Sequence, residues 1–363
     1  MVEGMSAVPA PESGPDAGAV WHYGDPLGEQ RAAEVAAVVV DRSHRGVISI
    51  SGADRRSWLH SLTTQHITEL PDGLSTENLS LDGQGRVEDH WVQTELDGVS
   101  YLDTEPWRAE PLLTYLQRMV FWADALPEKS DLAVLSLIGP KLTGPAVLAA
   151  VGVDALPEPM TAVALPGGGF ARRMPGDPPE LDLLIPRADV DARLAALRQA
   201  GVRPAGLWAY EAHRVAALRP RLGVDTDERT IPHEAGWIGG PGLGAVHLDK
   251  GCYRGQETVA RVHNLGRPPR MLVLLHLDGS ADRPQTGDPV TAGGRTVGRL
   301  GTVVEHVDDG PVALALIKRG IPADTELLAG DGVTARIDAD SMPPEDTPGA
   351  GRAAVDRLRA NRR

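Results

Sequence analysis

Hydrophobic positions recur with two different periods along this chain of 363 residues. Residues 47–51 alternate apolar side chains with serines, a pattern typical of a half-buried β-strand. Directly afterwards Trp58, Leu59 and Leu62 follow helical spacing, and Asp54 is placed to begin that helix. The first ordered part of the chain is therefore predicted to place a strand, a turn and an amphipathic helix in succession.

Hairpin signals dominate the next part of the chain. Three strand-like runs lie within residues 75–103, separated by Asp82-Gly83 and Asp97-Gly98, the dipeptides that favour tight two-residue turns. Runs with helical spacing and runs typical of strands then continue to mix without a regular order. Such mixing with hairpins predicts an α+β fold rather than a series of βαβ units.

The pattern changes after about residue 268, where short strand-like runs are joined by turns that carry Gly, Asp and Pro. Strands at this spacing are typical of a small barrel or sandwich. The termini are poor in bulky apolar residues, which predicts disorder. The predicted organisation is a disordered N-terminus at 1–20, a first domain at 21–268, a small β-domain at 269–338, and an acidic, Pro-rich linker with a basic tail at 339–363.

Composition narrows the class of protein. The chain is 42% hydrophobic and 24% charged, as in ordinary globular proteins, and its net charge of −14 argues against direct binding of nucleic acid. A single cysteine allows no intramolecular disulfide, which fits a reducing compartment. No apolar run approaches the ~18 residues of a membrane span, and the first residues lack the features of a signal peptide. We expect a cytoplasmic protein without a membrane partner.

The segment Asp249–Arg261 holds that single cysteine, Cys252. The cysteine lies between two glycines and has a cation two residues away on each side, Lys250 and Arg254. The residues from Gln256 onward predict the first turn of a helix, and a thiol before a helix N-terminus with cations nearby favours its thiolate form. A buried structural cysteine is the alternative, because free cysteines are often buried. The polar and glycine neighbours favour a reactive thiol.

The eight residues from Lys250 to Glu257 resemble the K-G-C-[FY]-x-G-Q-E signature of the YgfZ family. The residues that match it are Lys250, Gly251, Cys252, Tyr253, Gly255, Gln256 and Glu257. That family contains folate-binding relatives of the aminomethyltransferase GcvT that serve iron–sulfur protein assembly or repair and, through it, tRNA modification. The resemblance implies a catalytic thiolate at the mouth of a folate cavity, with both neighbouring cations holding its charge.

Further segments resemble GcvT-type proteins in the same order along residues 20–335: 41–44, 47–54, 85–89, 230–234 and 287–298. The resemblance implies a GcvT/YgfZ-like folate-binding domain around a central cavity, followed by a small C-terminal β-barrel. One departure is Ala216, which stands where the family's R-x-E-A-G carries a glutamate for the pterin ring. A methyl group accepts no hydrogen bond, so tetrahydrofolate binding would be weakened by roughly 1–3 kcal/mol or depend on other acceptors.

The resemblance also implies cofactor-binding residues outside the cysteine segment. Glu88 and Asp89 lie on the hairpin that supplies an acid at the reactive end of the folate, and strand alternation lets only one of them face inward. A solvated hairpin edge is the equal alternative for this pair. Arg214 begins the altered R-x-E-A-G segment, and Trp208 starts the helix that lines the cavity, where its ring would stack on the pterin. The other tryptophans weighed with it are assigned to the core: Trp58, Trp107, Trp122 and Trp237.

No metal site is expected. The eleven histidines show no ligand spacing, and one cysteine cannot hold an iron–sulfur cluster without ligands from a partner. The function implied is a folate-binding accessory protein for iron–sulfur assembly, whose partners are folate and iron–sulfur assembly or client proteins. An aminomethyltransferase that transfers a one-carbon unit to tetrahydrofolate is one alternative. A non-folate binding or redox protein on the same fold is the other.

Overall fold

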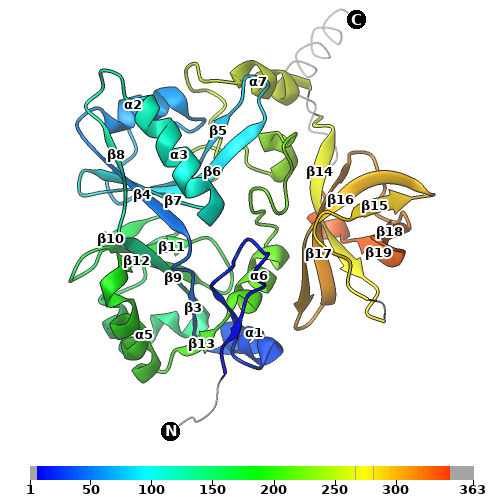
Figure 1. Cartoon of the computed structure of the whole chain (residues 1–363), viewed down its shortest axis with the longest axis horizontal. Helices are drawn as coiled ribbons and strands as arrows, with labels where there is room; N and C mark the ends of the chain where they lie inside the picture. The colour runs from blue at the N-terminus through cyan, green and yellow to red at the C-terminus, as the bar shows by residue number, and fades with distance from the viewer. Residues whose placement is uncertain (1–5, 266, 281, 344–363) are drawn as a thin grey trace, which may run out of the picture.

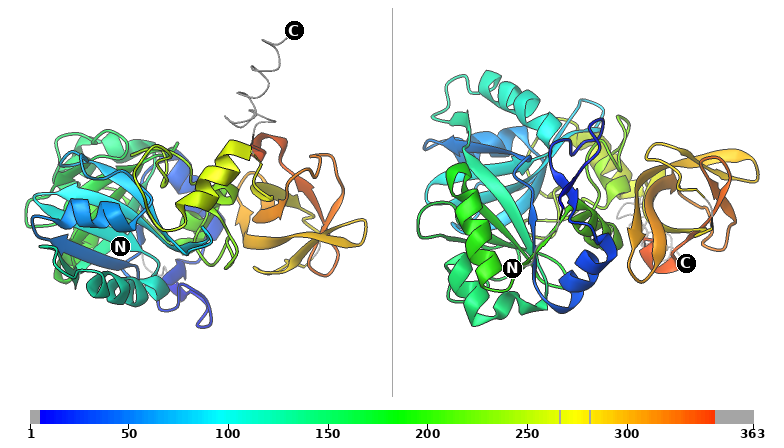
Figure 2. Two further views of the ribbon diagram at one scale, coloured as in Figure 1. Left: turned by 90° about the horizontal axis from the view of Figure 1, so that it is seen from above. Right: turned by 60° about the horizontal axis from the view of Figure 1, so that its bottom comes forward.

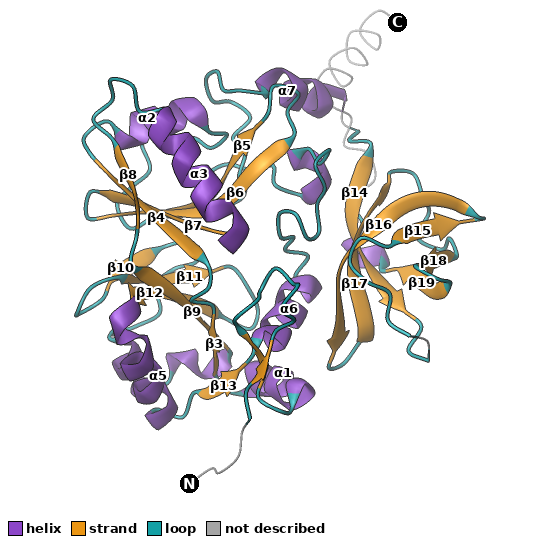
Figure 3. Cartoon of the chain, viewed as in Figure 1, coloured by secondary structure: helices purple, strands orange, loops and turns teal. Residues whose placement is uncertain are grey.

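The computed structural model describes residues 6–265, 267–280 and 282–343. Figure 1 shows two sheets, one above the other, with their helices on the outside and a separate barrel beside them. The same division is visible from two further directions in Figure 2. The mixture of helices and strands is that of an α+β protein (Figure 3).

The first sheet has five antiparallel strands in the order β5-β6-β7-β4-β8. These are β4 (Gly46–Ser51), β5 (Ser75–Leu81), β6 (Val87–Leu96), β7 (Val99–Thr104) and β8 (Leu126–Lys129). Two helices, α2 (Arg55–Leu62) and α3 (Pro106–Arg118), pack their apolar faces against it. Asp97 and Gly98 form the β6–β7 turn with φ of 50° and 79°, so the predicted two-residue hairpin is confirmed.

The second sheet has six strands in the order β10-β11-β12-β9-β3-β13. They are β3 (Val38–Asp41), β9 (Leu132–Ile138), β10 (Ala162–Ala164), β11 (Phe170–Met174), β12 (Glu180–Pro186) and β13 (Arg203–Ala205). Helices α4 (Pro145–Val151) and α5 (Val190–Gln199) cover one face. Helices α1 (Pro26–Val35) and α6 (Leu207–Ala216) pack near the β3–β13 edge.

A closed six-stranded barrel follows, in the order β14-β17-β16-β15-β18-β19. Its strands are β14 (Arg270–Leu277), β15 (Pro289–Ala292), β16 (Arg295–His306), β17 (Gly310–Lys318), β18 (Leu327–Ala329) and β19 (Val333–Ile337). Closure gives every strand two neighbours, and the interior is filled by side chains such as Val273, Leu300 and Ala315. A second apolar cluster joins the outside of the barrel to Val215 of α6.

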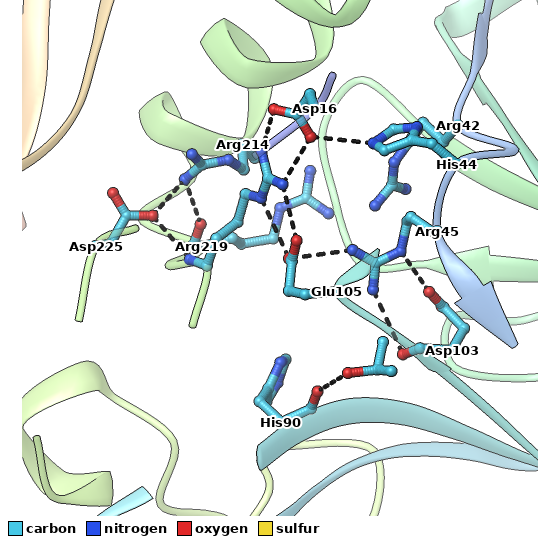
Figure 4. A network of polar contacts seen from close by, with 12 residues as sticks. Asp16, Arg42, His44, Arg45, His90, Asp103, Glu105, Arg214, Arg219 and Asp225 are labelled. Atoms are coloured by element: carbon cyan, nitrogen blue, oxygen red, sulfur yellow. Dashed lines mark hydrogen bonds and ion pairs between the residues drawn. The ribbon is translucent and has the colours of Figure 1, made fainter. Parts of the chain in front are cut away.

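Buried charges lie between the two sheets. Arg172 is 1% exposed and donates to Asp103 of β7 at 2.6 Å and to Asp182 of β12 at 2.8 Å. Arg45 also binds Asp103 (Figure 4). Because a buried charge is tolerated only when paired, these contacts fix how the sheets meet.

The expected disorder of residues 1–20 requires a correction for the part that the structure describes. Strand β1 (Val8–Pro9) pairs with β2 (Val20–His22), and the carboxylate of Asp16 is buried against Arg221. One ionic side chain and a short hairpin thus place a segment whose composition alone predicts disorder. At the other end, Ala339–Ser341 form a short 3₁₀ helix, and residues 344–363 of the predicted tail lie outside the described residues.

The prediction that the four tryptophans are core residues is confirmed for two of them. Trp58 and Trp237 are buried in apolar clusters. Trp122 is 99% exposed, and Trp107 is 36% exposed at the start of α3. Neither follows a strand or helix pattern that buries it, which is why a default based on residue type failed. Within the described residues, no helix combines the length and apolarity that crossing a membrane requires.

Candidate functional site

A pocket of about 800 Å³ opens where the β5–β6 hairpin, α3, the loop of residues 222–228 and β16 come together. The hairpin contributes residues 82 and 86–89, and α3 contributes one face of its first turns. The barrel contributes Arg299, which also donates to the carbonyl oxygens of Val224 and Thr226 and so fixes the loop. The pocket therefore depends on all three parts of the fold.

Both members of the acidic pair line this pocket, but their surroundings differ. Asp89 is 3% exposed, and its carboxylate accepts from Arg108 at 2.6 Å and from the Ser80 hydroxyl at 2.7 Å. Glu88 is exposed and pairs with Arg254 at 3.0 Å. The alternation of β6 thus buries Asp89 and turns Glu88 toward the cysteine segment.

Two aromatic rings and several arginines complete the wall. Trp107 and Tyr115 both come from α3 and line the pocket, and burial raises the pKa of Tyr115. Arg86 is exposed at the hairpin turn, and no acceptor in the described part of the chain contacts its guanidinium. A planar ring beside an uncommitted cation can bind a flat, anionic organic ligand.

The cysteine segment is held against the pocket hairpin by close backbone contact. Gly255 has a φ of 83°, and a Cβ there would lie 2.6 Å from the carbonyl oxygen of Asp82 and 2.8 Å from Cα of Gly85. At Gly85 a Cβ would lie 2.7 Å from Cβ of Thr258 in α7 (Gln256–Leu265). Both glycines are needed for this approach, and it places the start of α7, as predicted, directly against the turn of the pocket hairpin.

Lys250 serves the loop rather than the thiol. Its ammonium donates to the carbonyl oxygens of His60 at 2.6 Å, Thr63 at 2.5 Å and Gln65 at 3.2 Å, at the C-terminal end of α2. Burial lowers the pKa of Lys250 to about 8. This corrects the expectation that Lys250 holds a thiolate at Cys252, because three backbone acceptors already occupy its donors.

Arg254 is likewise directed away from that role by its ion pair with Glu88. Other members of the segment fix its shape. Tyr253 is buried in an apolar cluster, burial raises its pKa to about 12, and the Gln256 amide donates to the carbonyl oxygen of Lys250. Glu257 is exposed in the first turn of α7.

Cys252 itself is exposed and does not belong to the pocket wall. The thiol thus faces solvent on a rigid loop, separate from the pocket but connected to it through the Gly255–Gly85 contact. A buried structural cysteine, the alternative drawn from the sequence, is not what the structure shows.

Two expected cofactor residues are placed elsewhere. Trp208 lies outside the pocket wall, with its ring 5.7 Å from Trp21 and 5.8 Å from His22 of β2. Arg214 is buried and binds Glu211 and Asp225, tying α6 to the barrel side of the molecule. These contacts correct the sequence-based assignment: the N-terminal strand covers Trp208, and protein acceptors occupy Arg214.

Ala216 is exposed at the C-terminal end of α6 and does not line the pocket. The sequence analysis overlooked Trp107, Arg108 and Tyr115, which do. The signal available for Trp107 was its position directly after a predicted strand and at the start of a helix, where binding residues often lie. In the described residues, no group of three or more His, Cys, Asp or Glu side chains is arranged to hold a metal ion.

Comparison with known proteins adds sequence and structural relatives. Residues 270–344 match the family model "CAF17, C-terminal beta-barrel domain". A protein of Arabidopsis thaliana described as a chloroplastic transferase is 26% identical over 72% of this chain and 61% of its own length. An aminomethyltransferase of Legionella pneumophila is 28% identical over 59% of this chain and 62% of its own length. The chain thus spans about three fifths of the length of these curated relatives.

The crystal structure of the glycine cleavage system aminomethyltransferase T from Bartonella henselae superposes with a TM-score of 0.80. The match covers 96% of this chain and 95% of that one at 18% identity, so it concerns the fold. The class that follows is a GcvT-like α+β protein. More particularly, it is a GcvT-like protein whose C-terminal barrel is of the CAF17 type.

Proposed function

We propose that this protein belongs to the YgfZ/CAF17 group and binds tetrahydrofolate in the pocket beside Asp89 and Trp107. The observation that carries the proposal is the pocket itself, about 800 Å³ in volume and lined by an aromatic ring, carboxylates and arginines within a GcvT-like fold. Its size lies in the range of ordinary ligand sites, roughly 300–1,000 Å³.

The donor and acceptor set fits such a ligand. The Trp107 ring offers a stacking face, the carboxylates of Asp89 and Asp227 accept from amino and ring N–H groups, and Arg86 offers its guanidinium to a glutamyl carboxylate. Asp227 is held by Arg270, whose bond, together with burial, brings the pKa of Asp227 to about 2. When bound, tetrahydrofolate supplies the nitrogen atoms that carry a one-carbon unit. Acceptors other than residue 216 thus compensate for Ala216.

The role proposed for the bound form is that of an accessory protein in iron–sulfur cluster assembly or repair, with Cys252 as the reactive residue. An exposed thiol on a glycine-anchored loop is accessible to a partner protein, which would supply the other ligands of any cluster. The contact between that loop and the pocket hairpin connects ligand binding to the position of the thiol.

Aminomethyltransferase activity is the second candidate, favoured by one observation: Asp89 lines the pocket at the hairpin position where the resemblance places the acid. The curated Legionella relative carries that name. Formation of methylenetetrahydrofolate from an aminomethylated carrier protein separates the two. Turnover would support the second candidate, whereas binding without turnover would support the accessory role.

Calorimetry with tetrahydrofolate under anaerobic conditions tests the folate proposal. Trp107→Ala should weaken binding about tenfold or more, because a stacked ring contributes on the order of 1–3 kcal/mol. Trp122→Ala is the matched control, since Trp122 is 99% exposed and outside the pocket. Equal affinity of Trp107→Ala and wild type would refute the assigned site.

Cys252→Ala tests the division between pocket and thiol. We expect folate affinity within twofold of wild type, because the thiol does not line the pocket. In cells that lack the chain, however, this variant should fail to restore iron–sulfur enzyme activity that the wild type restores. Full restoration by Cys252→Ala would refute the role of the thiol and leave the folate site untouched.

A further inference from the structure

The N-terminal hairpin is held down by one side chain. In residues 11–18, all described by the structure, Asp16 is 5% exposed, whereas its neighbours are exposed or half-buried. The strands that flank this stretch, β1 and β2, contain two and three residues. Two-stranded ribbons this short are marginal on their own, so the contacts of Asp16 carry much of what places the loop.

Those contacts are the ones that an arginine makes with a bound carboxylate. Arg221 donates from Nη1 to Oδ2 at 2.9 Å and from Nη2 to Oδ1 at 2.8 Å, a bidentate pair. The ring of His44 reaches the same carboxylate with Nε2 at 3.0 Å from Oδ1, a contact visible in Figure 4. Arg221 is 9% exposed, so this site is formed within the protein.

The site does not depend on Asp16 to keep Arg221 paired. Glu105 accepts from Arg221 Nη2 at 2.8 Å, and Glu211 accepts from Nη1 at 3.1 Å. If the Asp16 carboxylate leaves, the buried guanidinium still has two acidic partners and is not left uncompensated. Exchange of one carboxylate for another at this position is therefore inexpensive.

The site also adjoins the pocket. The Cζ atom of Arg221 lies 5.7 Å from the centre of the Trp107 ring, and Trp107 lines the pocket. The next two residues, Leu222 and Gly223, line it as well. Only one layer of side chains and backbone thus separates the carboxylate of Asp16 from the ligand space.

We propose that Arg221 and His44 form a carboxylate-binding site, that Asp16 occupies it in the closed form of the N-terminal hairpin, and that a ligand carboxylate displaces Asp16 and releases the hairpin. The ligand class is an organic carboxylate, whether a free dicarboxylate or the glutamyl group of a larger molecule. The inference extends the proposed function but does not require it, because a simple carboxylate suffices.

Hydrogen exchange of residues 8–22, followed by mass spectrometry, tests the proposal on the full chain. Glutarate is the first probe, compared with sodium chloride at equal ionic strength. We expect glutarate to accelerate exchange of this segment in the wild type. Asp16→Asn should exchange about tenfold faster without any ligand, as expected for loss of one charge-assisted contact, and glutarate should add little. The matched control is Glu12→Gln, which changes an exposed acid of the same loop and should behave as wild type.

Tetrahydrofolate is the second probe and identifies the source of the carboxylate. Faster exchange with tetrahydrofolate than with glutarate assigns the site to the glutamyl group of that ligand, and the reverse assigns it to free carboxylates. Unchanged exchange of wild-type residues 8–22 with both probes overturns the proposal and leaves Asp16 as a structural pin. Failure of the folate proposal is recognised separately, as absence of calorimetric binding while glutarate still releases the hairpin.

Discussion

The ammonium of Lys250 closes the C-terminal end of α2 by donating to three backbone carbonyl oxygens. Carbonyl groups at a helix end lack partners within the helix, and a cation there is favourable. The sequence places this lysine two residues from Cys252, and distance along the chain suggested that it serves the thiol. In the folded protein its long side chain reaches back about 190 residues to another element.

Lys250→Met should destabilise the protein by about 1–3 kcal/mol, because the substitution leaves buried carbonyl groups without a donor. Urea unfolding followed by tryptophan fluorescence measures the change. Lys129→Met removes a lysine that is exposed on β8, and it should cost less than about 0.5 kcal/mol. Equal effects of the two substitutions would show that the carbonyl contacts contribute no stability.

Residue types were therefore predictable from the sequence where their partners were not. The sequence singled out Arg214 and Trp208, but only the fold shows that one binds Glu211 and that β2 covers the other. Contacts between residues so far apart in the chain depend on packing, which local patterns do not encode.

At the scale of elements, the cysteine loop and the β5–β6 hairpin pack through glycine. Turns of this kind were readable from the sequence, since Asp82-Gly83 and Asp97-Gly98 specify hairpins locally. That the first of these hairpins meets the loop of Gly255 was not readable, because the contact joins segments about 170 residues apart. The barrel strands were predicted well because each carries its own turn signals.

Gly255→Ala should separate the two elements. The added Cβ meets backbone atoms within 3 Å, and the φ of 83° is unfavourable for alanine, so we expect a loss of about 1–3 kcal/mol and faster reaction of Cys252 with a thiol reagent. Gly251→Ala is the matched control on the other side of the cysteine, where a Cβ would meet nothing within 4 Å. A Gly255→Ala protein with the melting temperature and thiol reactivity of Gly251→Ala would contradict this account.

At the scale of the whole molecule, buried ion pairs join the two sheets and the N-terminal hairpin. Burial alone would raise the pKa of the Glu105 carboxyl, but Arg221 and Arg45 outweigh it and hold that pKa at about 2. Burial likewise opposes, and arginines again dominate, at Asp103, whose pKa is well below its usual range. For Asp16, bonds to His44 and Arg221 have the same net effect.

Stability should therefore fall in acid. Carboxyl groups with depressed pKa values bind fewer protons in the folded than in the unfolded state, so their contribution is complete above the unfolded pKa of about 4 and is lost as the pH falls toward 2. Urea midpoints between pH 6 and 3 measure this loss. Asp16→Asn, with one such carboxyl fewer, should lose less than Glu12→Gln, which should follow the wild type. A midpoint independent of pH over this range would contradict the ionic account.

The central claim is that the pocket between the hairpin, α3, the 222–228 loop and β16 is the folate site. Hydrogen exchange of the wild type with and without tetrahydrofolate tests it most directly, because it reports where the ligand lies. The account predicts slower exchange in residues 82–89, 107–115 and 222–228, with little change around residues 198–204, which line a separate pocket of about 820 Å³. Protection confined to residues 198–204, or no protection in any of these segments, would contradict it.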